Sequence, residues 1–345
     1  MTKILDHPYE CDANWKGPEL AASSDWIYTL TVNDIAELEA ALQNVKSRGL
    51  EIPAIGKQDF PLPSLSKKLA GIANELETGR GFTLMRGVPV DRYATEDAKI
   101  LYWGIMSYFG ESAAQNMMGE LVSNVKAIDG DWNQNFNIRG YQTRVHLPFH
   151  CDKADLVGLM CLQTAKAGGE SCISSSVAIH NEIQRARPDL LEALYQPFYI
   201  DHRGEEFHDG DPFYIAPVFA IHKGHFYARF GQRYAETAQR FPQVPRLTPG
   251  QIEGMKLFST LALSDAFRLD MIFQRGDIQM LNNHLIVHSR TDYEDWPEPE
   301  RRRHLLRMIL LTGDDQDAPD FTRNLNAFIR RWGVEPRQSV LETLE

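Results

Sequence analysis

His150-Cys151-Asp152, followed after a short gap by Val157-Gly158-Leu159-Met160-Cys161-Leu162-Gln163-Thr164, is the stretch that decides the fold of this chain. The second part is short and apolar, which favours a buried strand. The first part carries an imidazole and a carboxylate at positions i and i+2, and these positions project to the same face of an extended backbone. The stretch therefore predicts a strand preceded by a His/Asp pair that converges on one point.

Similar short runs recur over the second two thirds of the chain. They cover residues 121–128, 157–164, 171–176, 217–221, 225–230, 277–281 and 304–311. Two helices interrupt them, one over 179–186 and one opened by a capping box at Thr248 with proline at its first position. Many short strands separated by turn signals favour a sandwich or barrel of the jelly-roll type with helical cover.

The first third of the chain is mainly helical. Apolar residues recur at helical spacing in three segments, 33–49, 64–79 and 95–110, and a short strand-like run covers 82–85. We therefore expect a mainly β protein with α-helices, built as one domain over 1–345. It has a helical N-terminal part over about 1–115, a barrel core over about 120–312 and a C-terminal extension over 313–345.

Composition excludes several classes of protein. The 345 residues are 43% hydrophobic, which is ordinary for a globular chain, and 36 Lys plus Arg against 47 Asp plus Glu give a net charge of −11. Such a charge disfavours nucleic acid and membrane surfaces as partners. Four cysteines without tight metal spacing, and no leader or spanning segment, predict reduced thiols and a cytoplasmic protein. A homodimer is the default expectation for its assembly.

Two later histidines compete to be the third ligand of a metal bound by His150 and Asp152. His284 and His288 both lie in the segment that follows the run 277–281. A second His-x-acid match, His180-Asn181-Glu182, lies in a predicted helix, where positions i and i+2 do not face each other, and it is set aside.

The last run places two arginines on one strand face. Arg303, Leu305, Arg307 and Ile309 alternate with His304, Leu306 and Met308. An arginine on a mostly apolar face needs an anionic partner, because an unpaired buried charge is costly. That partner is either a structural acid or a bound carboxylate.

Two imidazoles and one carboxylate on one face of a metal are the ligand set of non-haem Fe(II) oxygenases. With neutral histidines the iron keeps one net positive charge. This favours an anionic bidentate co-substrate, and a dicarboxylate would also explain the separate arginine.

Several spaced motifs resemble, in their order, the signature of the taurine dioxygenase-like family. They are His150-x-Asp152, Gly168-Gly169-Glu170-Ser171, Gly276-Asp277, Asn282-Asn283, His288-Ser289-Arg290 and Arg303-His304-Leu305-Leu306-Arg307. The family belongs to the Fe(II)/2-oxoglutarate-dependent dioxygenases of the clavaminate synthase-like superfamily. The resemblance runs from about Gly79 to Leu311 and implies a double-stranded β-helix, a cupin-like jelly-roll barrel with surrounding helices and with iron at its mouth.

The resemblance also implies roles for individual residues. His150, Asp152 and His288 become the catalytic iron ligands, with His288 preferred to His284 because it precedes the Ser-Arg step. Arg303 and Ser171 become the residues that hold the far carboxylate of 2-oxoglutarate. Arg307 is expected to contact either 2-oxoglutarate or an anionic group of the substrate.

The expected reaction is oxidation of a C–H bond in a small polar organic substrate, by hydroxylation or desaturation. It consumes O2 and 2-oxoglutarate and releases succinate and CO2. The resemblance also implies that halogenation is not expected, because halogenating members carry a small residue where this chain has Asp152. Arg307, Arg144, Arg139 and Asn135 indicate an anionic or amino-acid-like substrate. Two alternatives stay open: a zinc-dependent hydrolase or isomerase that uses the same ligands, and a non-catalytic ligand-binding barrel.

Overall fold

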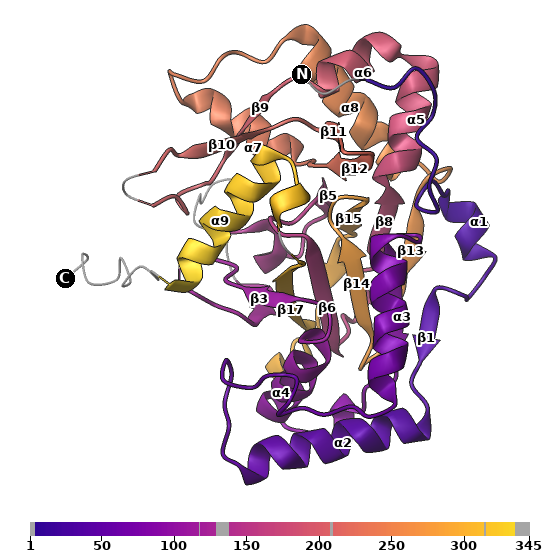
Figure 1. Cartoon of the computed structure of the whole chain (residues 1–345), viewed down its shortest axis with the longest axis vertical. Coiled ribbons are helices and arrows are strands. Elements are labelled where there is room, and N and C mark those ends of the chain that lie inside the picture. The colour runs from indigo at the N-terminus through magenta and orange to yellow at the C-terminus, as the bar shows by residue number, and fades with distance from the viewer. Residues whose placement is uncertain (1–3, 117, 129–137, 208–209, 314, 335–345) are drawn as a thin grey trace.

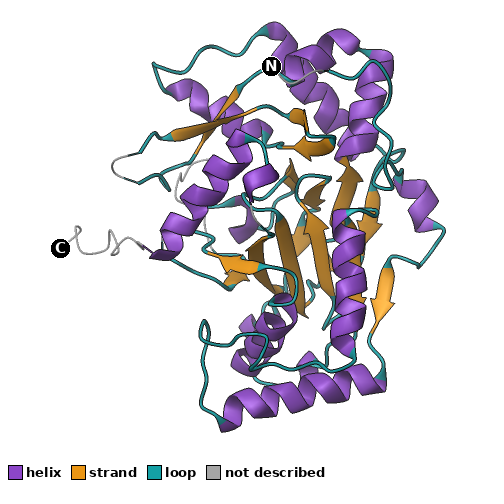
Figure 2. Ribbon diagram, in the orientation of Figure 1, coloured by secondary structure: helices purple, strands orange, loops and turns teal. Residues whose placement is uncertain are grey.

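The computed structural model describes residues 4–116, 118–128, 138–207, 210–313 and 315–334, and the structural statements below concern these residues. Two β-sheets form the centre of the molecule, and helices surround them (Figures 1 and 2). The larger sheet has seven strands in the order β1-β2-β14-β6-β17-β3, and β4 pairs with β17 beside this path. The smaller sheet has four strands in the order β13-β8-β15-β5.

Strands far apart in the chain pair with one another in both sheets. The larger sheet contains β1 Ile27–Thr29, β2 Phe82–Arg86, β3 Glu111–Ala113, β4 Ser123–Val125, β6 Leu156–Gln163, β14 Ile278–Asn282 and β17 His304–Leu311. The smaller sheet contains β5 Leu147–His150, β8 Ser171–Ser175, β13 Leu269–Met271 and β15 Ile286–Arg290. All pairs in the two sheets are antiparallel except the parallel pair of β1 with β2.

Three two-stranded ribbons complete the β-structure of the described residues. They are β7 Ala167–Gly168 with β16 Tyr293–Glu294, β9 Phe198–Asp201 with β10 Phe213–Ala216, and β11 Phe219–His222 with β12 His225–Ala228. The ribbon of β7 and β16 is continuous in sequence with the smaller sheet, because β7 immediately precedes β8 and β16 immediately follows β15.

Helices lie at both ends of the molecule and along its sides (Figure 1). They are α1 Gly17–Ala21, α2 Val32–Ser47, α3 Leu65–Glu77, α4 Thr95–Met106, α5 Ser176–Ala186, α6 Pro188–Leu194, α7 Gln232–Thr237, α8 Pro249–Leu263 and α9 Asp320–Val334. Figure 1 shows α2 and α4 at one end, and α5, α6 and α8 at the opposite end. None of the helices in the described part is long and apolar enough to cross a membrane.

The larger sheet separates two apolar cores. Leu306, Met308 and Leu310 of β17 pack with the buried residues of α2, α3 and α4. Leu305 and Ile309 face the other way, into the core that they share with the smaller sheet and with α5, α6 and α8. This alternation confirms the two-residue period predicted for the run 304–311. It also leaves one face of β17 turned toward β15 and β5, where the candidate site lies.

The observed architecture is a mixed α/β fold with several sheets. β1 and β2 come from the expected helical part of the chain and extend the larger sheet, because β2 pairs with β14. The sheet therefore begins well before the expected core range of 120–312. Its strands in the part of the chain that the structure describes do not form one closed ring.

Candidate active site

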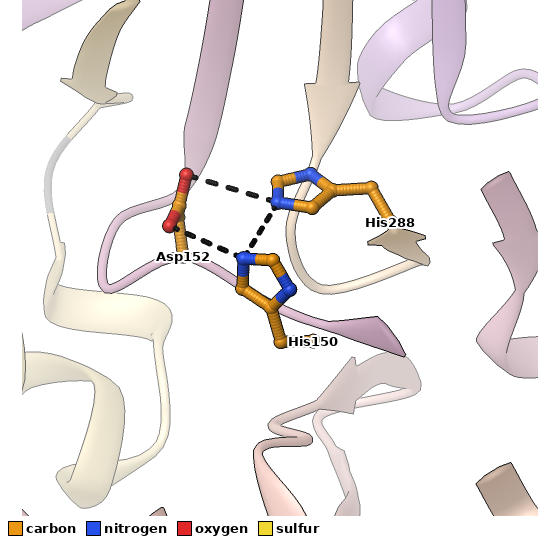
Figure 3. A group of neighbouring side chains, drawn as sticks. All are labelled: His150, Asp152 and His288. Carbon is orange, nitrogen blue, oxygen red and sulfur yellow. Dashed lines mark hydrogen bonds and ion pairs between the residues drawn. The ribbon is translucent and has the colours of Figure 1, made fainter. Parts of the chain in front are cut away.

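The predicted ligand residues lie side by side on two paired strands. His150 ends β5, and it stands opposite His288 of the antiparallel strand β15. The two Nε2 atoms are 3.0 Å apart, and each lies 3.9 Å from an oxygen of the Asp152 carboxylate (Figure 3). In the described residues, this is the one group of three His, Cys, Asp or Glu side chains gathered closely enough to hold a metal ion.

The donor atoms of this group have the chemistry that a metal ion requires. His150 shares a hydrogen bond of 2.9 Å between its Nδ1 and the Pro148 carbonyl, so Nδ1 carries the proton and Nε2 keeps its lone pair. Burial lowers the pKa of His150, and burial together with the neighbouring His150 ring lowers the pKa of His288 to about 3. Both rings are therefore neutral at pH 7.

The acidic member of the group is charged and incompletely satisfied. Burial by itself would raise the pKa of Asp152, but the Arg307 guanidinium, together with the two histidines when they are protonated at low pH, outweighs it and holds the pKa below its ordinary value. Its Oδ2 atom is buried and has no hydrogen-bond partner among the described residues. Ligand atoms at right angles on a metal with bonds of about 2.1 Å lie about 3.0 Å apart, as the two Nε2 atoms do. The residues present therefore fit a divalent metal ion.

The competing histidines are engaged elsewhere. The Nε2 atom of His284 lies 2.9 Å from the Asp155 carboxylate. Asp155 also accepts a hydrogen bond from the Thr312 backbone N–H. His180 is fully buried in α5, and its Nε2 lies 2.9 Å from the Tyr195 hydroxyl. Neither ring is available to the group of His150, Asp152 and His288.

A cavity of about 660 Å³ opens beside the three ligand residues. Arg303, Leu305, Arg307 and Ile309 all line it, so the expectation that these four residues share one face is confirmed. Ser171 lines the same cavity from β8. The three predicted metal ligands and the three predicted cofactor-binding residues thus surround one space between the two sheets.

Arg303 has a buried guanidinium at one side of this cavity. Its side chain is 5% exposed, and its Nη1 atom lacks a hydrogen-bond partner in the described structure. Its backbone N–H donates to Asp295, which fixes the start of β17. Ser171 donates its hydroxyl to Gln279 at 3.0 Å.

Arg290 is a second buried guanidinium at the same place. The Tyr293 ring lies 4.7 Å from the Arg290 guanidinium carbon and 5.2 Å from that of Arg303. Burial and the neighbouring Arg303 lower the pKa of Arg290 to about 10, and its Nη1 atom has no partner in the described part of the chain. The sequence reasoning did not select Arg290 as a site residue, although it stands two positions after His288 on the same strand face.

Arg307 lies beside the ligand residues instead. Its Nη1 is 3.4 Å from Asp152 Oδ1, and its Nε donates to the side-chain oxygen of Gln115 at 2.7 Å. Gln115 also donates to the Arg307 carbonyl at 2.7 Å, and the Tyr141 ring lies 4.7 Å from the guanidinium carbon. Gln115 therefore holds both the main chain and the side chain of Arg307, a role that no sequence pattern indicated.

The other candidate substrate residues separate in space. Arg139 lines the cavity and forms an ion pair of 2.9 Å with Glu205. Arg144 lies in a second groove, 3.7 Å from Asp295. Asn135 lies outside the described residues.

Comparison with known proteins identifies the class of this enzyme. The family model described as "Taurine catabolism dioxygenase TauD, TfdA family" matches residues 46–309, and the chain therefore belongs to this family of dioxygenases. The resemblance found in the sequence motifs is confirmed.

Individual relatives cover almost the whole chain. FR-33289 synthase of Streptomyces rubellomurinus is 28% identical over 97% of this chain and 98% of its own length. Taurine hydroxylase-like protein SAT17 of Stachybotrys chartarum is 28% identical over 95% of this chain and 88% of its own. Among solved structures, an asparagine oxygenase complex has a TM-score of 0.64 at 18% identity, covering 83% of this chain and 94% of its own. The non-haem iron oxygenase OrfP has a TM-score of 0.61 at 15% identity, covering 84% and 94%.

Proposed function

We propose that the chain is an Fe(II)- and 2-oxoglutarate-dependent dioxygenase that oxidises a C–H bond of a small polar organic substrate and releases succinate and CO2. The observation that carries this proposal is the convergence of the two Nε2 atoms, 3.0 Å apart, with the Asp152 carboxylate beside a cavity that contains buried arginines. Membership of a dioxygenase family favours this function over a zinc hydrolase or a non-catalytic barrel.

His150, Asp152 and His288 are proposed to hold the Fe(II) ion. When iron, 2-oxoglutarate and O2 are bound, they supply the oxidising power that breaks the C–H bond. The protein keeps the donor atoms in place: the Pro148 carbonyl fixes the His150 ring, and the Asn283 side chain accepts a hydrogen bond from the Asp152 backbone N–H at 3.1 Å. Asp152 supplies a carboxylate ligand, and on the family resemblance this favours hydroxylation or desaturation over halogenation as the proposed outcome.

Arg303, Arg290 and Ser171 are proposed to bind the far carboxylate of 2-oxoglutarate. A carboxylate placed between the two guanidiniums would satisfy Nη1 atoms that are buried and unpartnered in the described structure. Arg307 contacts Asp152 and not the Tyr293 ring that joins the other two arginines, and we therefore assign it to the substrate side.

The finer description of the fold belongs to the same proposal. We propose that the two sheets form a double-stranded β-helix of the jelly-roll type and that the chain is a single domain, since residues of both sheets share one core. The asparagine oxygenase complex contains hydroxyasparagine, and an OrfP complex contains hydroxy-L-arginine. These bound molecules support a small, polar, amino-acid-like substrate here. The cytoplasmic location and the homodimer stay predictions.

Anaerobic titration of the metal-free protein with Fe(II) and then 2-oxoglutarate tests this function. We expect the visible charge-transfer band that arises when a keto acid chelates iron through two atoms. Arg303→Ala and Arg290→Ala should each weaken 2-oxoglutarate binding by about tenfold or more, because each removes a charge-assisted hydrogen bond in a buried site. Arg185→Gln is the matched control, since the Arg185 side chain is 71% exposed and pairs with Glu182 on the protein surface. A folded, iron-loaded protein that never develops the band would contradict the proposal.

A further inference from the structure

The cavity carries a charge opposite in sign to that of the whole chain. The chain has a net charge of −11, yet the cavity is lined by seven Lys and Arg side chains and by only three acids, Asp152, Glu205 and Glu236. On the proposed function, Fe(II) and the 2-oxoglutarate dianion bring charges that cancel each other. The excess of positive charge among the described lining residues therefore remains when both are bound.

Most of these cations already have a partner or an assigned role. Arg139 and Lys153 both pair with Glu205, at 2.9 and 3.3 Å. Arg307 lies against Asp152, and Arg290 and Arg303 belong to the co-substrate end of the cavity. Arg233 also has a partner within the protein. Arg229 forms no ion pair with a carboxylate in the described residues, although the Asp152 carboxylate is near enough to interact with it electrostatically, and it has no role in the proposed reaction.

Arg229 is held directly beside the metal ligands. It follows the last residue of β12, and its backbone N–H donates to the Val218 carbonyl at 2.8 Å. The carbonyl of the next residue, Phe230, accepts the N–H of Cys151 at 2.8 Å. The side chain reaches across this junction, and its Nη1 donates to the main-chain carbonyl of Asp152. The guanidinium is thus fixed to the segment that carries a proposed iron ligand.

The rest of this guanidinium is unsatisfied. Arg229 is 4% exposed, and its Nε and Nη2 atoms have no hydrogen-bond partner in the part of the chain that the structure describes. Buried N–H groups of a charged side chain that make no hydrogen bond are costly. Nε and Nη2 form one edge of the planar fork that matches an oxyanion through two parallel hydrogen bonds. The side chain therefore has the hydrogen-bonding capacity and the charge to receive an anionic ligand group in this cavity.

We propose that Arg229 is the residue that binds the anionic group expected on the primary substrate, and that this group is an oxyanion: a carboxylate, phosphate or phosphonate. Arg229 is anchored to Asp152, so it would place the anionic group near the iron and the oxidised C–H bond a short distance from that group. Ser171, Arg290 and Arg303 come from other elements and would remain free for the co-substrate carboxylate.

Small anions can test this site before the substrate is known. The Fe(II)- and 2-oxoglutarate-loaded protein is titrated anaerobically with acetate, inorganic phosphate or methylphosphonate, and the change in the charge-transfer band is followed. Acetamide, which has the shape of acetate without its charge, is the control probe. The same probes are titrated into the metal-free protein, with the melting temperature as the readout. We expect at least one anion, and not acetamide, to bind in both forms.

Substitution then assigns the binding to Arg229. Arg229→Gln should weaken binding of the effective anion by about tenfold or more, Arg229→Lys should weaken it less, and Arg185→Gln should leave it unchanged. The wild-type band that forms before any probe is added reports on the proposed function separately, and the metal-free titration reports on the anion site even if no band forms. Comparison of the binding affinities of acetate, phosphate and methylphosphonate decides which oxyanion the site prefers.

Three outcomes would overturn the inference. The first is that no anion binds to either form of the wild-type protein. The second is that an anion binds equally well to wild type and to Arg229→Gln. The third is that Arg229→Gln loses Fe(II) binding while the metal-free protein still binds the anion with wild-type affinity, which would make Arg229 a support for Asp152 only.

Discussion

At the scale of single residues, the site depends on which histidine reaches the metal. His288 stands opposite His150 across β15 and β5, whereas His284 lies in the turn before β15 and is bound to Asp155. The sequence left both open, and only the resemblance to a family preferred His288. The structure supplies a physical reason for this choice, because Nε2 of His284 is already engaged by the Asp155 carboxylate and is not available to a metal ion.

His288→Ala should abolish stoichiometric Fe(II) binding and substrate-dependent succinate formation, because two ligands would remain where three are required. His284→Ala is the matched control. It should keep the Fe(II) affinity within a few-fold of wild type and lower thermal stability, since it leaves the buried Asp155 carboxylate without one partner. Metal binding measured by competition with a chromophoric chelator separates the two variants. A His288→Ala protein that still binds one Fe(II) tightly would refute the ligand assignment.

The other site residues differ in how well the sequence pattern could predict them. Arg303 and Arg307 could be predicted because a charged residue interrupts an apolar strand face twice. Arg290 could have been found by continuing the same two-residue period from His288. Arg229 and Gln115 carried no such signal, since their roles arise from contacts with residues about 77 and 192 positions away in the chain.

At the scale of elements, capping decides where the first long helix starts. The predicted segment opened at Asn33, but α2 begins at Val32 with Thr31 as its N-cap. The Thr31 hydroxyl accepts the Asp34 N–H, and the Asp34 carboxylate accepts the Thr31 N–H at 2.9 Å. The reciprocal hydrogen bonds of Thr31 and Asp34 stabilise this helix start more than a single capping residue such as Asn33 would. The third helix shows the same limit, because threonine favours the cap position, yet Thr95 is the first residue of α4 and Ala94 is its N-cap.

Thr31→Ala should lower the free energy of unfolding by about 1 kcal/mol, because it removes the capping hydroxyl from α2. Val32→Ala is a suitable control, since Val32 is the neighbouring residue and its side chain is 83% exposed. Urea unfolding of both variants measures the difference. Equal stability of Thr31→Ala and wild type would mean that solvent replaces the cap.

Strand prediction worked where the alternation was long. The run 304–311 coincides with β17, and the run 157–164 agrees with β6 to within one residue. The ribbon of β9 and β10 was not predicted, because within the described residues its four-residue strands pair with each other alone and their burial does not alternate cleanly. Pairing between distant strands, such as β2 with β14, could not be read from local pattern at all.

At the scale of the whole molecule, buried neutral histidines link stability to pH. Burial lowers the pKa of His180 to about 4, and burial also lowers the pKa of His304 to about 4. The unfolded chain takes up a proton at each of these sites near its ordinary pKa of 6.5, whereas the folded chain resists protonation until about pH 4. Between these values the unfolded state binds more protons, so stability is fully present above pH 6.5 and is lost as the pH falls.

His180→Gln should therefore make stability less dependent on pH. For His180 alone, the shift corresponds to about 3 kcal/mol lost between pH 7 and pH 4. We expect wild type to lose more unfolding free energy over this interval than the variant does, even if the variant is less stable at pH 7. Chemical denaturation of the metal-free protein at several pH values measures both slopes. Parallel slopes would show that His180 is not kept neutral by the fold.

The last helix of the described chain supports one wall of the cavity from behind, through residues that are not proposed metal ligands. Phe328 of α9 stacks on the His202 ring at 4.2 Å, and the Trp332 indole donates to the Glu205 carbonyl at 3.2 Å. His202 and Glu205 line the cavity, while the iron ligands proposed here lie on β5, its following loop and β15. Substitutions in α9 are therefore expected to change which molecules the cavity admits without replacing a proposed metal ligand. Evolution and protein engineering can both use this helix to alter substrate specificity.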